Sequence, residues 1–166
     1  MTNWTTWQAR LHANLLFVVR DGKILLIRKK RGSGAGKING PGGKVDPGET
    51  PLEAALRETY EELGIKALDA EQRGELHFQF DDGDSLHCAV FLAHDFAGEP
   101  CETAEAVPLW TPLDQIPYDE MWADDRHWLP LLFRGAHFCG YFEFRGEELL
   151  SHEIVVRESA AFPTPR

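Results

Sequence analysis

The sequence predicts a single α/β domain, in which a mixed β-sheet has two helices packed on it. With 166 residues, of which 43% are hydrophobic, the chain is long enough to bury a sizeable core. Segments with strand periodicity outnumber those with helical periodicity. No long Pro-, Gly- or Ser-rich linker, internal repeat or low-complexity tract divides the sequence. We therefore expect residues 1–166 to form one domain.

Strand signals follow one another along most of the chain. Asp21-Gly22 is a hairpin turn signal between strands expected at residues 13–19 and 23–28. Residues 76–80 alternate apolar and polar side chains, as a half-buried strand does. The remaining segments are listed in chain order: a glycine-rich loop at 31–43, strands at 86–94, 109–110, 137–144 and 149–157, and a disordered tail at 159–166.

The clearest helix signal covers residues 51–63. Thr50 suits the N-cap, Pro51 suits the first helical position, and Glu53 completes a capping box with Thr50. Gly64 ends the helix. At about 100° per residue, one stripe faces the core. This stripe consists of Leu52, Ala55, Leu56, Thr59 and Leu63. Asp124 or Asp125 is expected to cap a second helix that runs to about Phe133.

Three acids crowd one turn of the first helix, at the edge of the buried stripe. Glu58, Glu61 and Glu62 are spaced i, i+3 and i+4, so they repel one another on the helix surface. A stable helix does not need that repulsion, whereas a site for a hard cation such as Mg²⁺ needs carboxylate oxygens. The alternative is a solvated acidic helix face. Arg57 lies four residues before Glu61 and can hold it in one rotamer.

These residues carry a resemblance to the Nudix family, whose motif has fixed glycine, glutamate and arginine positions. The matching positions are Gly43, Glu49, Arg57, Glu58, Glu61, Glu62, Gly64 and Ile65. Thr59 departs from the pattern, because the family carries an apolar residue there. Since Thr59 is on the buried stripe, we expect its hydroxyl to bond back to the preceding turn.

The similarity extends over residues 13–158 and is strongest to the family members that act on oxidised purine nucleotides. It rests on the segments RKKRGSGAGKINGPGGKV, HFQF, PLDQIPYDEMWADDRHWLPLLF and HFCGYFEFRG. The resemblance implies the Nudix α/β/α sandwich. It also implies hydrolysis of 8-oxo-dGTP, 2-hydroxy-dATP and related triphosphates to the monophosphate and pyrophosphate, which cleans the nucleotide pool.

The resemblance also implies a set of catalytic and metal-binding residues. The metal ligands are expected to be Glu58, Glu61, Glu62, the Gly42 carbonyl and the loop residue Glu105, which alternatively takes a proton from water. The cation is Mg²⁺, with Mn²⁺ as a substitute. Glu49 and Arg57 are expected to orient the helix and its carboxylates. Which glutamate is the general base stays open.

A second set of residues is implied in binding the nucleotide. Trp122 matches the residue that stacks on the base, and Phe78 and Phe80 match aromatics of the pocket; each alternatively belongs to the core. Asn39 matches a side chain that hydrogen-bonds the purine, although Asn-Gly is also a turn signal. Asn14 stands where the family protein has a threonine near the base, and Ser33 replaces a phenylalanine at the pocket rim. Lys29 and Lys44 either lie along the polyphosphate or are surface lysines.

The neighbouring acids Asp124 and Asp125 have two interpretations. In the first interpretation, one of the two acids caps the second helix. In the second, the two acids titrate as a pair in which one keeps a proton near neutral pH. A protonated acid donates a hydrogen bond and an ionised acid accepts one. Such a pair beside Trp122 can recognise the edge of 8-oxoguanine or 2-hydroxyadenine.

Composition excludes several classes of partner. The net charge of −10 argues against a nucleic-acid polymer, whose phosphates require a basic face, and is compatible with a small phosphorylated substrate screened by metal ions. The sequence has no 18-residue apolar run, and residues 1–12 lack a signal-peptide core. Three widely spaced cysteines give no disulfide framework. We expect a cytoplasmic monomer.

Two rival functions remain open at this point. One is a Nudix hydrolase for ADP-ribose, dinucleoside polyphosphates or ordinary nucleoside triphosphates. The other is an inactive nucleotide-sensing or protein-interaction module, which should have lost its carboxylates. All four acids of the motif are present in this chain.

Overall fold

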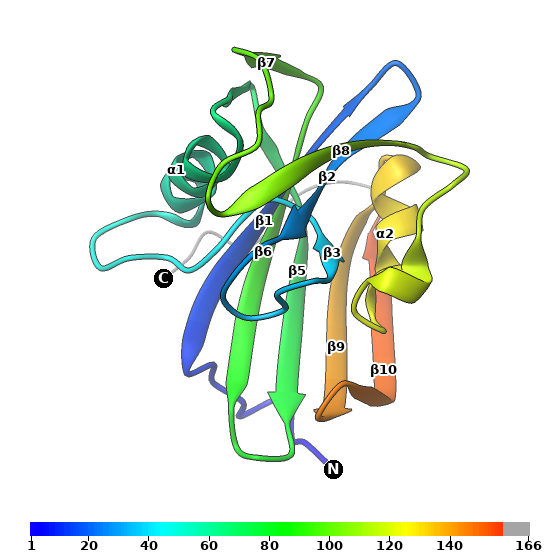
Figure 1. Cartoon of the computed structure of the whole chain (residues 1–166). Coiled ribbons are helices and arrows are strands. Elements are labelled where there is room, and N and C mark those ends of the chain that lie inside the picture. Colours follow the sequence, from blue (N-terminus) through cyan, green and yellow to red (C-terminus); the bar gives the residue numbers. More distant parts are fainter. Residues whose placement is uncertain (158–166) are drawn as a thin grey trace.

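A mixed eight-stranded β-sheet forms the centre of the protein, seen in a computed structural model that describes residues 1–157 (Figure 1). The strand order is β10-β9-β5-β6-β1-β2-β3, and β8 pairs with β2. The strands of this sheet are β1 (Leu11–Arg20), β2 (Lys23–Lys29), β3 (Ile38–Asn39), β5 (Glu71–Phe80), β6 (Ser85–Ala93), β8 (Ala106–Pro112), β9 (His137–Arg145) and β10 (Glu148–Arg157). The sheet is mixed because β1 pairs with β6 and β5 pairs with β9 in parallel, whereas the other pairs are antiparallel.

Two helices cover opposite faces of this sheet, α1 (Pro51–Leu63) and α2 (Asp125–Phe133) (Figure 1). Alternate residues of β1 face in opposite directions. Leu16 and Val18 pack in one hydrophobic cluster with α1, whereas Phe17 packs in the other with α2. The predicted sandwich of a mixed sheet between helices is therefore confirmed.

Each strand expected from the sequence is present, and most extend one or more residues further. Both residues of the predicted turn have positive φ, 53° at Asp21 and 74° at Gly22, as a tight hairpin requires. Three short strands were not expected: β3, which lies within the predicted glycine-rich loop, and β4 (Lys66–Leu68) with β7 (Asp95–Ala97), which form a small sheet of their own. A 3₁₀ turn, η1 (Tyr118–Glu120), precedes α2. The predicted tail at 159–166 lies outside the described residues.

Helix α1 has the predicted bounds, and its capping box is complete at Thr50 and Glu53. The Thr59 hydroxyl donates to the Ala55 carbonyl at 2.7 Å, which confirms the expected bond to the preceding turn. The predicted stripe was only partly right. Ala55, Thr59 and Leu63 are buried, but Leu52 and Leu56 are half-buried, and Ala54 and Glu62 are buried in their place.

Helix α2 ends at Phe133 as predicted, but the cap expected from an aspartate was wrong. Asp124 occupies the N-cap position, yet its side chain makes no capping hydrogen bond. Its carboxylate instead accepts from the Trp128 indole. Within residues 1–157, no helix has the length and apolar character needed to cross a membrane.

Candidate active site

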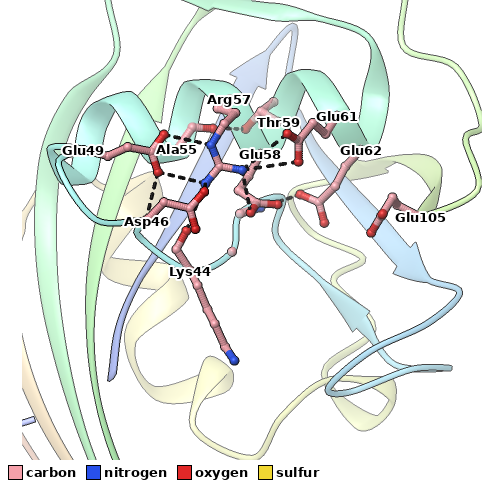
Figure 2. A network of polar contacts seen from close by, with 12 residues as sticks. Lys44, Asp46, Glu49, Ala55, Arg57, Glu58, Thr59, Glu61, Glu62 and Glu105 are labelled. Carbon is pink, nitrogen blue, oxygen red and sulfur yellow. Dashed lines mark hydrogen bonds and ion pairs between the residues drawn. The ribbon is translucent and has the colours of Figure 1, made fainter. Parts of the chain in front are cut away.

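Arg57 is the centre of a network of charged groups on the first turns of α1 (Figure 2). Its guanidinium donates twice to Glu49, from Nε at 2.8 Å and from Nη2 at 2.9 Å. Nη1 donates to Glu58 at 3.0 Å and reaches Glu61 at 3.3 Å, so the expected contact with Glu61 is present. These hydrogen bonds lower the pKa of Glu49 to about 2. Arg57 thus holds three carboxylates in fixed positions.

Glu62 points from α1 toward the loop that precedes the helix (Figure 2). It is only 3% exposed, and its Oε1 accepts from the Gly42 backbone N–H at 2.8 Å. Burial, with the nearby charges of Glu58 and Glu105, raises its pKa to about 8. A carboxylate buried with so little compensating charge is poised to take a cation. The sequence placed Glu62 at the edge of the stripe and missed this burial.

The loop approaches so closely that a side chain at Gly42 would clash with backbone, and one at Gly43 would displace the Glu58 carboxylate. A Cβ on Gly43 would lie 2.5 Å from the Glu58 Cδ atom, and a Cβ on Gly42 would lie 2.1 Å from the Asn14 carbonyl oxygen. Gly42 also has a φ of 148°. Burial raises the pKa of Glu58 despite its hydrogen bond from Arg57. Glu58 and Glu62 therefore face a loop whose backbone lies directly against them.

The other two expected metal ligands lie at the rim of this cluster. Glu61 is exposed, and Arg57 holds its carboxylate. Glu105, from the loop before β8, pairs with Arg31 at 2.5 Å, and Figure 2 shows it on the Glu62 side of the helix. Glu105 is therefore paired with an arginine outside the Arg57 network, whereas Glu61 belongs to that network.

Asn14 is an almost fully buried amide next to the same loop. It is 1% exposed, and its Oδ1 accepts from the Gly43 N–H at 3.4 Å. Its Nδ2 has no hydrogen-bond partner among the described residues. An unsatisfied buried donor is costly unless a bound group accepts from it. Because side chains alternate along β1, its side chain points to the same face as Leu16, which packs in the cluster with α1.

The aromatics expected in the base pocket lie on the α2 side of the sheet. Phe78 is buried and stacks on Phe142 at 5.3 Å between ring centroids, so it is part of the core. Phe80 is half-buried and stacks on Phe144 at 5.7 Å. Trp122, in the segment before α2, is half-buried. Phe80 and Trp122 thus keep surface that a base can contact.

The glycine-rich loop packs directly against Trp122. A Cβ on Gly34 would lie 3.2 Å from the Trp122 Nε1 atom, and the Lys37 ammonium lies 5.0 Å from the centre of its ring. Ser33, next to Gly34, is exposed, and its carbonyl accepts from Lys29 Nζ at 2.8 Å. Ser33 is therefore adjacent in sequence to the glycine that packs on Trp122.

Asn39 and the two lysines complete the expected nucleotide-binding set. Asn39 belongs to β3, and its amide donates weakly to the Lys37 carbonyl at 3.3 Å. The charge of Lys29 lowers the pKa of Glu62, which places this ammonium within electrostatic reach of the acidic cluster. Lys44 is exposed and extends from the loop (Figure 2).

Asp124 and Asp125 are buried together, 4% and 8% exposed. Asp124 Oδ2 accepts from Trp128 Nε1 at 2.8 Å. Burial raises the pKa of Asp124 to about 6, and burial together with the negative charge of Asp124 raises the pKa of Asp125 well above its usual range. These raised pKa values are in the direction expected of a pair that retains one proton near neutral pH, and that titration stays a prediction.

This pair should make the protein less stable as the pH rises. The folded pKa values are above the unfolded value of 3.8, so the folded state binds more protons, and stability falls from about pH 4 through pH 6 and beyond. We expect the free energy of unfolding of Asp125→Asn at pH 8 to exceed that of the wild type by on the order of 1 kcal/mol or more, so the variant should melt at a higher temperature. At pH 4 the two proteins should melt at the same temperature. Thermal unfolding at both pH values measures this, with exposed Asp119→Asn as the matched control. A lower melting temperature at pH 8 contradicts the shifted pKa.

Several features of the site were missed from the sequence. Lys37 over Trp122 and the ion pair of Asp46 with Arg57 arise from loop conformation and carry no motif. The contact of Asp124 with Trp128 had a visible signal, because the two residues are four apart in a helix.

Comparison with known proteins is consistent with this geometry. The sequence model of the NUDIX domain matches residues 10–132. The oxidized purine nucleoside triphosphate hydrolase of Danio rerio is 43% identical over 137 residues, covering 82% of this chain and 88% of that protein. The protein of the same name from Mus musculus is 40% identical over 142 residues, covering 84% and 91%. The crystal structure of the MutT protein from Bacillus halodurans has a TM-score of 0.78 and 28% identity, covering 87% of this chain and 97% of that one.

Proposed function

This chain belongs to the Nudix hydrolase family, and we propose that it hydrolyses oxidised purine nucleoside triphosphates such as 8-oxo-dGTP and 2-hydroxy-dATP. The products are the monophosphate and pyrophosphate. Removing these nucleotides keeps miscoding bases from polymerases. The names of the two animal relatives support this substrate class, since their identity to the chain extends over most of its length.

The observation that carries the proposal is the buried pair Asp124–Asp125 beside Trp122. A pocket for an ordinary base needs no pair of acids with shifted pKa values, because burying them costs free energy. A proton shared between two carboxyls offers one donor and one acceptor in a dry site. That is the pattern needed to distinguish a purine edge altered by oxidation.

Nudix hydrolases use divalent metal ions, and we assign the ion here to Mg²⁺, with Mn²⁺ as a substitute. Glu58, Glu61, Glu62 and Glu105, with the Gly42 carbonyl, would hold it. The fit rests on Glu62, which is buried with a raised pKa and a backbone N–H as its hydrogen-bond donor. When bound, the ion screens the triphosphate and lowers the pKa of the attacking water.

The other polar residues of the site position these carboxylates and the substrate. Arg57 and Glu49 hold Glu58 and Glu61 in place through the hydrogen bonds described above. Asn14 offers an unused buried amide next to Gly43. Lys29 stands within electrostatic reach of the acids and can neutralise phosphate charge.

A panel of nucleotides tests the substrate class. We expect kcat/KM for 8-oxo-dGTP and 2-hydroxy-dATP to exceed that for dGTP and dATP by about 10-fold or more, the discrimination given by a matched polar contact. Release of monophosphate and pyrophosphate identifies the bond cleaved. A preference for ADP-ribose, a dinucleoside polyphosphate or an ordinary triphosphate would establish the rival hydrolase instead. Absence of pyrophosphate release from every nucleotide would establish the inactive module, although the complete set of acids argues against it.

Ser33→Phe should tighten purine binding. An aromatic ring at this rim position can cover the base next to Trp122, which is worth about 1 kcal/mol, or roughly a 5-fold lower KM. We expect kcat to change little, because the contact is equal in ground state and transition state. Steady-state kinetics with 8-oxo-dGTP measures both constants. Ala35→Phe, two residues away and also exposed, is the control. A KM that stays constant or rises in Ser33→Phe would place Ser33 away from the rim.

We place the protein in the cytoplasm, and we expect a monomer that binds small nucleotides and no nucleic-acid polymer. Cys88, Cys101 and Cys139 are all free thiols, as in proteins of reducing compartments. The net charge of −10 would repel a nucleic-acid backbone. Light scattering of the purified chain tests the monomer directly.

A further inference from the structure

A second group of metal-ligand side chains lies on the sheet, separate from the Nudix carboxylates. Glu75, His77 and His87 each offer one ligand atom, and these atoms lie within 4.8 Å of one another. We propose that these three residues form a binding site for a divalent transition metal, specifically Zn²⁺. Nothing in the hydrolytic reaction requires them, so the site is an addition to the proposed function.

The strand register places the three side chains together on a rigid surface. His77 of β5 is directly opposite His87 of β6, and Glu75 is two residues before His77, so all three point to the same face. The His87 Nε2 atom lies 3.3 Å from Glu75 Oε1, and the two imidazole rings are 5.2 Å apart. Cross-strand pairs in the interior of a sheet need little ordering when a ligand binds.

The site lies on the α1 face but beyond the core beneath that helix. Ala89 and Phe91 of β6 pack in the α1 cluster, and His87 follows on the same face outside that cluster. Here the start of the chain covers the sheet (Figure 1). The ring of Trp7 meets His77 edge-on at 5.4 Å, and Trp4 lies 5.2 Å from Tyr141. The aromatic cover excludes part of the solvent and leaves His87 partly accessible.

A backbone contact orients His77 as metal-binding histidines are oriented. The Nδ1 atom of His77 lies 2.9 Å from the Gly140 carbonyl, which can only accept a hydrogen bond. Nδ1 therefore carries the proton, and the Nε2 lone pair is available as a ligand. In metal sites, the non-ligating nitrogen usually donates to a carbonyl or carboxylate in this way.

The choice of Zn²⁺ follows from the ligand types. Two imidazoles with one carboxylate suit Zn²⁺ and leave a coordination position open, whereas Mg²⁺ prefers an all-oxygen set. Cys139 is the nearest thiol, with its Sγ 3.9 Å from His77 Nδ1. This thiol instead donates to the Tyr141 hydroxyl at 3.3 Å, so it already has a hydrogen-bond partner. The partly exposed rim near His12, whose ring is 5.6 Å from His87, gives water access to that position.

The competing interpretation is a plain hydrogen bond between His87 and Glu75 on a half-buried surface. This contact lowers the pKa of Glu75. It involves only His87 and Glu75, whereas the proposed site also uses His77. The two interpretations differ in one measurable property, which is Zn²⁺ affinity in the presence of Mg²⁺.

Calorimetric titration of the full chain with Zn²⁺, in excess Mg²⁺ that fills the Nudix carboxylates, tests the proposal. We expect one Zn²⁺ to bind per chain. His87→Gln and Glu75→Gln should each weaken it by more than about 100-fold, since even residues that only support a ligand give 10–100-fold losses. Zn²⁺ should also raise the melting temperature of the wild type but not of these variants. Glu75→Gln retains a similar shape, so it serves if His87→Gln does not fold.

Three controls separate this site from other binders of Zn²⁺. Glu62→Gln should keep the Zn²⁺ affinity, because it alters only the Nudix cluster. His94→Gln should also keep it, because His94 is exposed and contacts the Val19 carbonyl instead. His152→Gln removes one ring of the His127–His152 stack, whose centroids are 4.0 Å apart. Loss of binding in Glu62→Gln or His152→Gln, or unchanged binding in both Glu75→Gln and His87→Gln, would overturn the proposal.

Discussion

Replacing Glu62 with glutamine should lower kcat by about 100-fold or more, the size of effect seen when a strong electrostatic contribution is removed from an active site. The change keeps the shape of the side chain and an oxygen that accepts from the Gly42 N–H, but it removes the buried charge. Glu61→Gln should have a comparable effect, because it removes a second proposed ligand. Pyrophosphate release from 8-oxo-dGTP with Mg²⁺ measures both.

The stability of the metal-free protein should stay the same or rise in Glu62→Gln, although kcat falls. The pKa of Glu62 is raised to about 8, so between about pH 4.5 and 8 the folded metal-free protein keeps a proton that the unfolded chain releases, and its stability falls as the pH rises. Glu62→Gln should therefore melt at the same or a higher temperature than the wild type above pH 7 without metal. Glu153→Gln, on the exposed face of β10, controls for the loss of a negative charge. Full activity in Glu62→Gln would refute its assignment as a metal ligand.

Asp124→Asn and Asp125→Asn should change the ratio of kcat/KM for 8-oxo-dGTP to that for 2-hydroxy-dATP. Asparagine is nearly isosteric with aspartate, but it cannot ionise and always offers both a donor and an acceptor. The base that loses its match should lose about 1–3 kcal/mol, because a buried polar edge is left unpaired. Asp125→Asn should have the larger effect, because Asp124 is already engaged by Trp128.

The purely structural explanation makes a different prediction. If the pair serves only to anchor Trp128, the variants should change the melting temperature and leave base preference constant. Measuring kcat/KM for both oxidised nucleotides and for dGTP, together with thermal unfolding, separates the two roles. Asp119→Asn, whose side chain is 97% exposed, is the control. An unchanged preference ratio in both variants would remove the main support for an oxidised-purine substrate.

Local signals predicted the fold well where the chain itself determines the structure. The bounds of α1 follow from Thr50, Glu53 and Gly64, whose capping interactions lie within one turn of each helix end. The two-residue strand β3 has no periodicity, because it exists only through its pairing with β2. Strands β4 and β7 likewise define each other. Such short pairings depend on contacts distant in sequence, which a single sequence does not display.

The contacts of the candidate site likewise include some that spacing along the sequence predicts and some that depend on residues far apart in the chain. The bond from Arg57 to Glu61 follows from their spacing of four residues along one helix. The burial of Glu62 does not, because it is produced by the loop that folds back over the helix at Gly42. Whether an aromatic such as Phe78 lines a pocket or fills the core also depends on β9, which supplies Phe142 from far along the chain.

The parallel pairing of β5 with β9 also determines when the protein can fold during synthesis. Gly74–Phe80 of β5 pairs with Phe138–Phe144 of β9, so about sixty residues are made between the two partners. A nascent chain that ends before β9 exposes one edge of β5 and leaves Phe78 without its stacking partner. Contacts of such long range form slowly. The sheet is therefore completed only after β9 has left the ribosome, and until then β5 is an open edge on which another chain can pair.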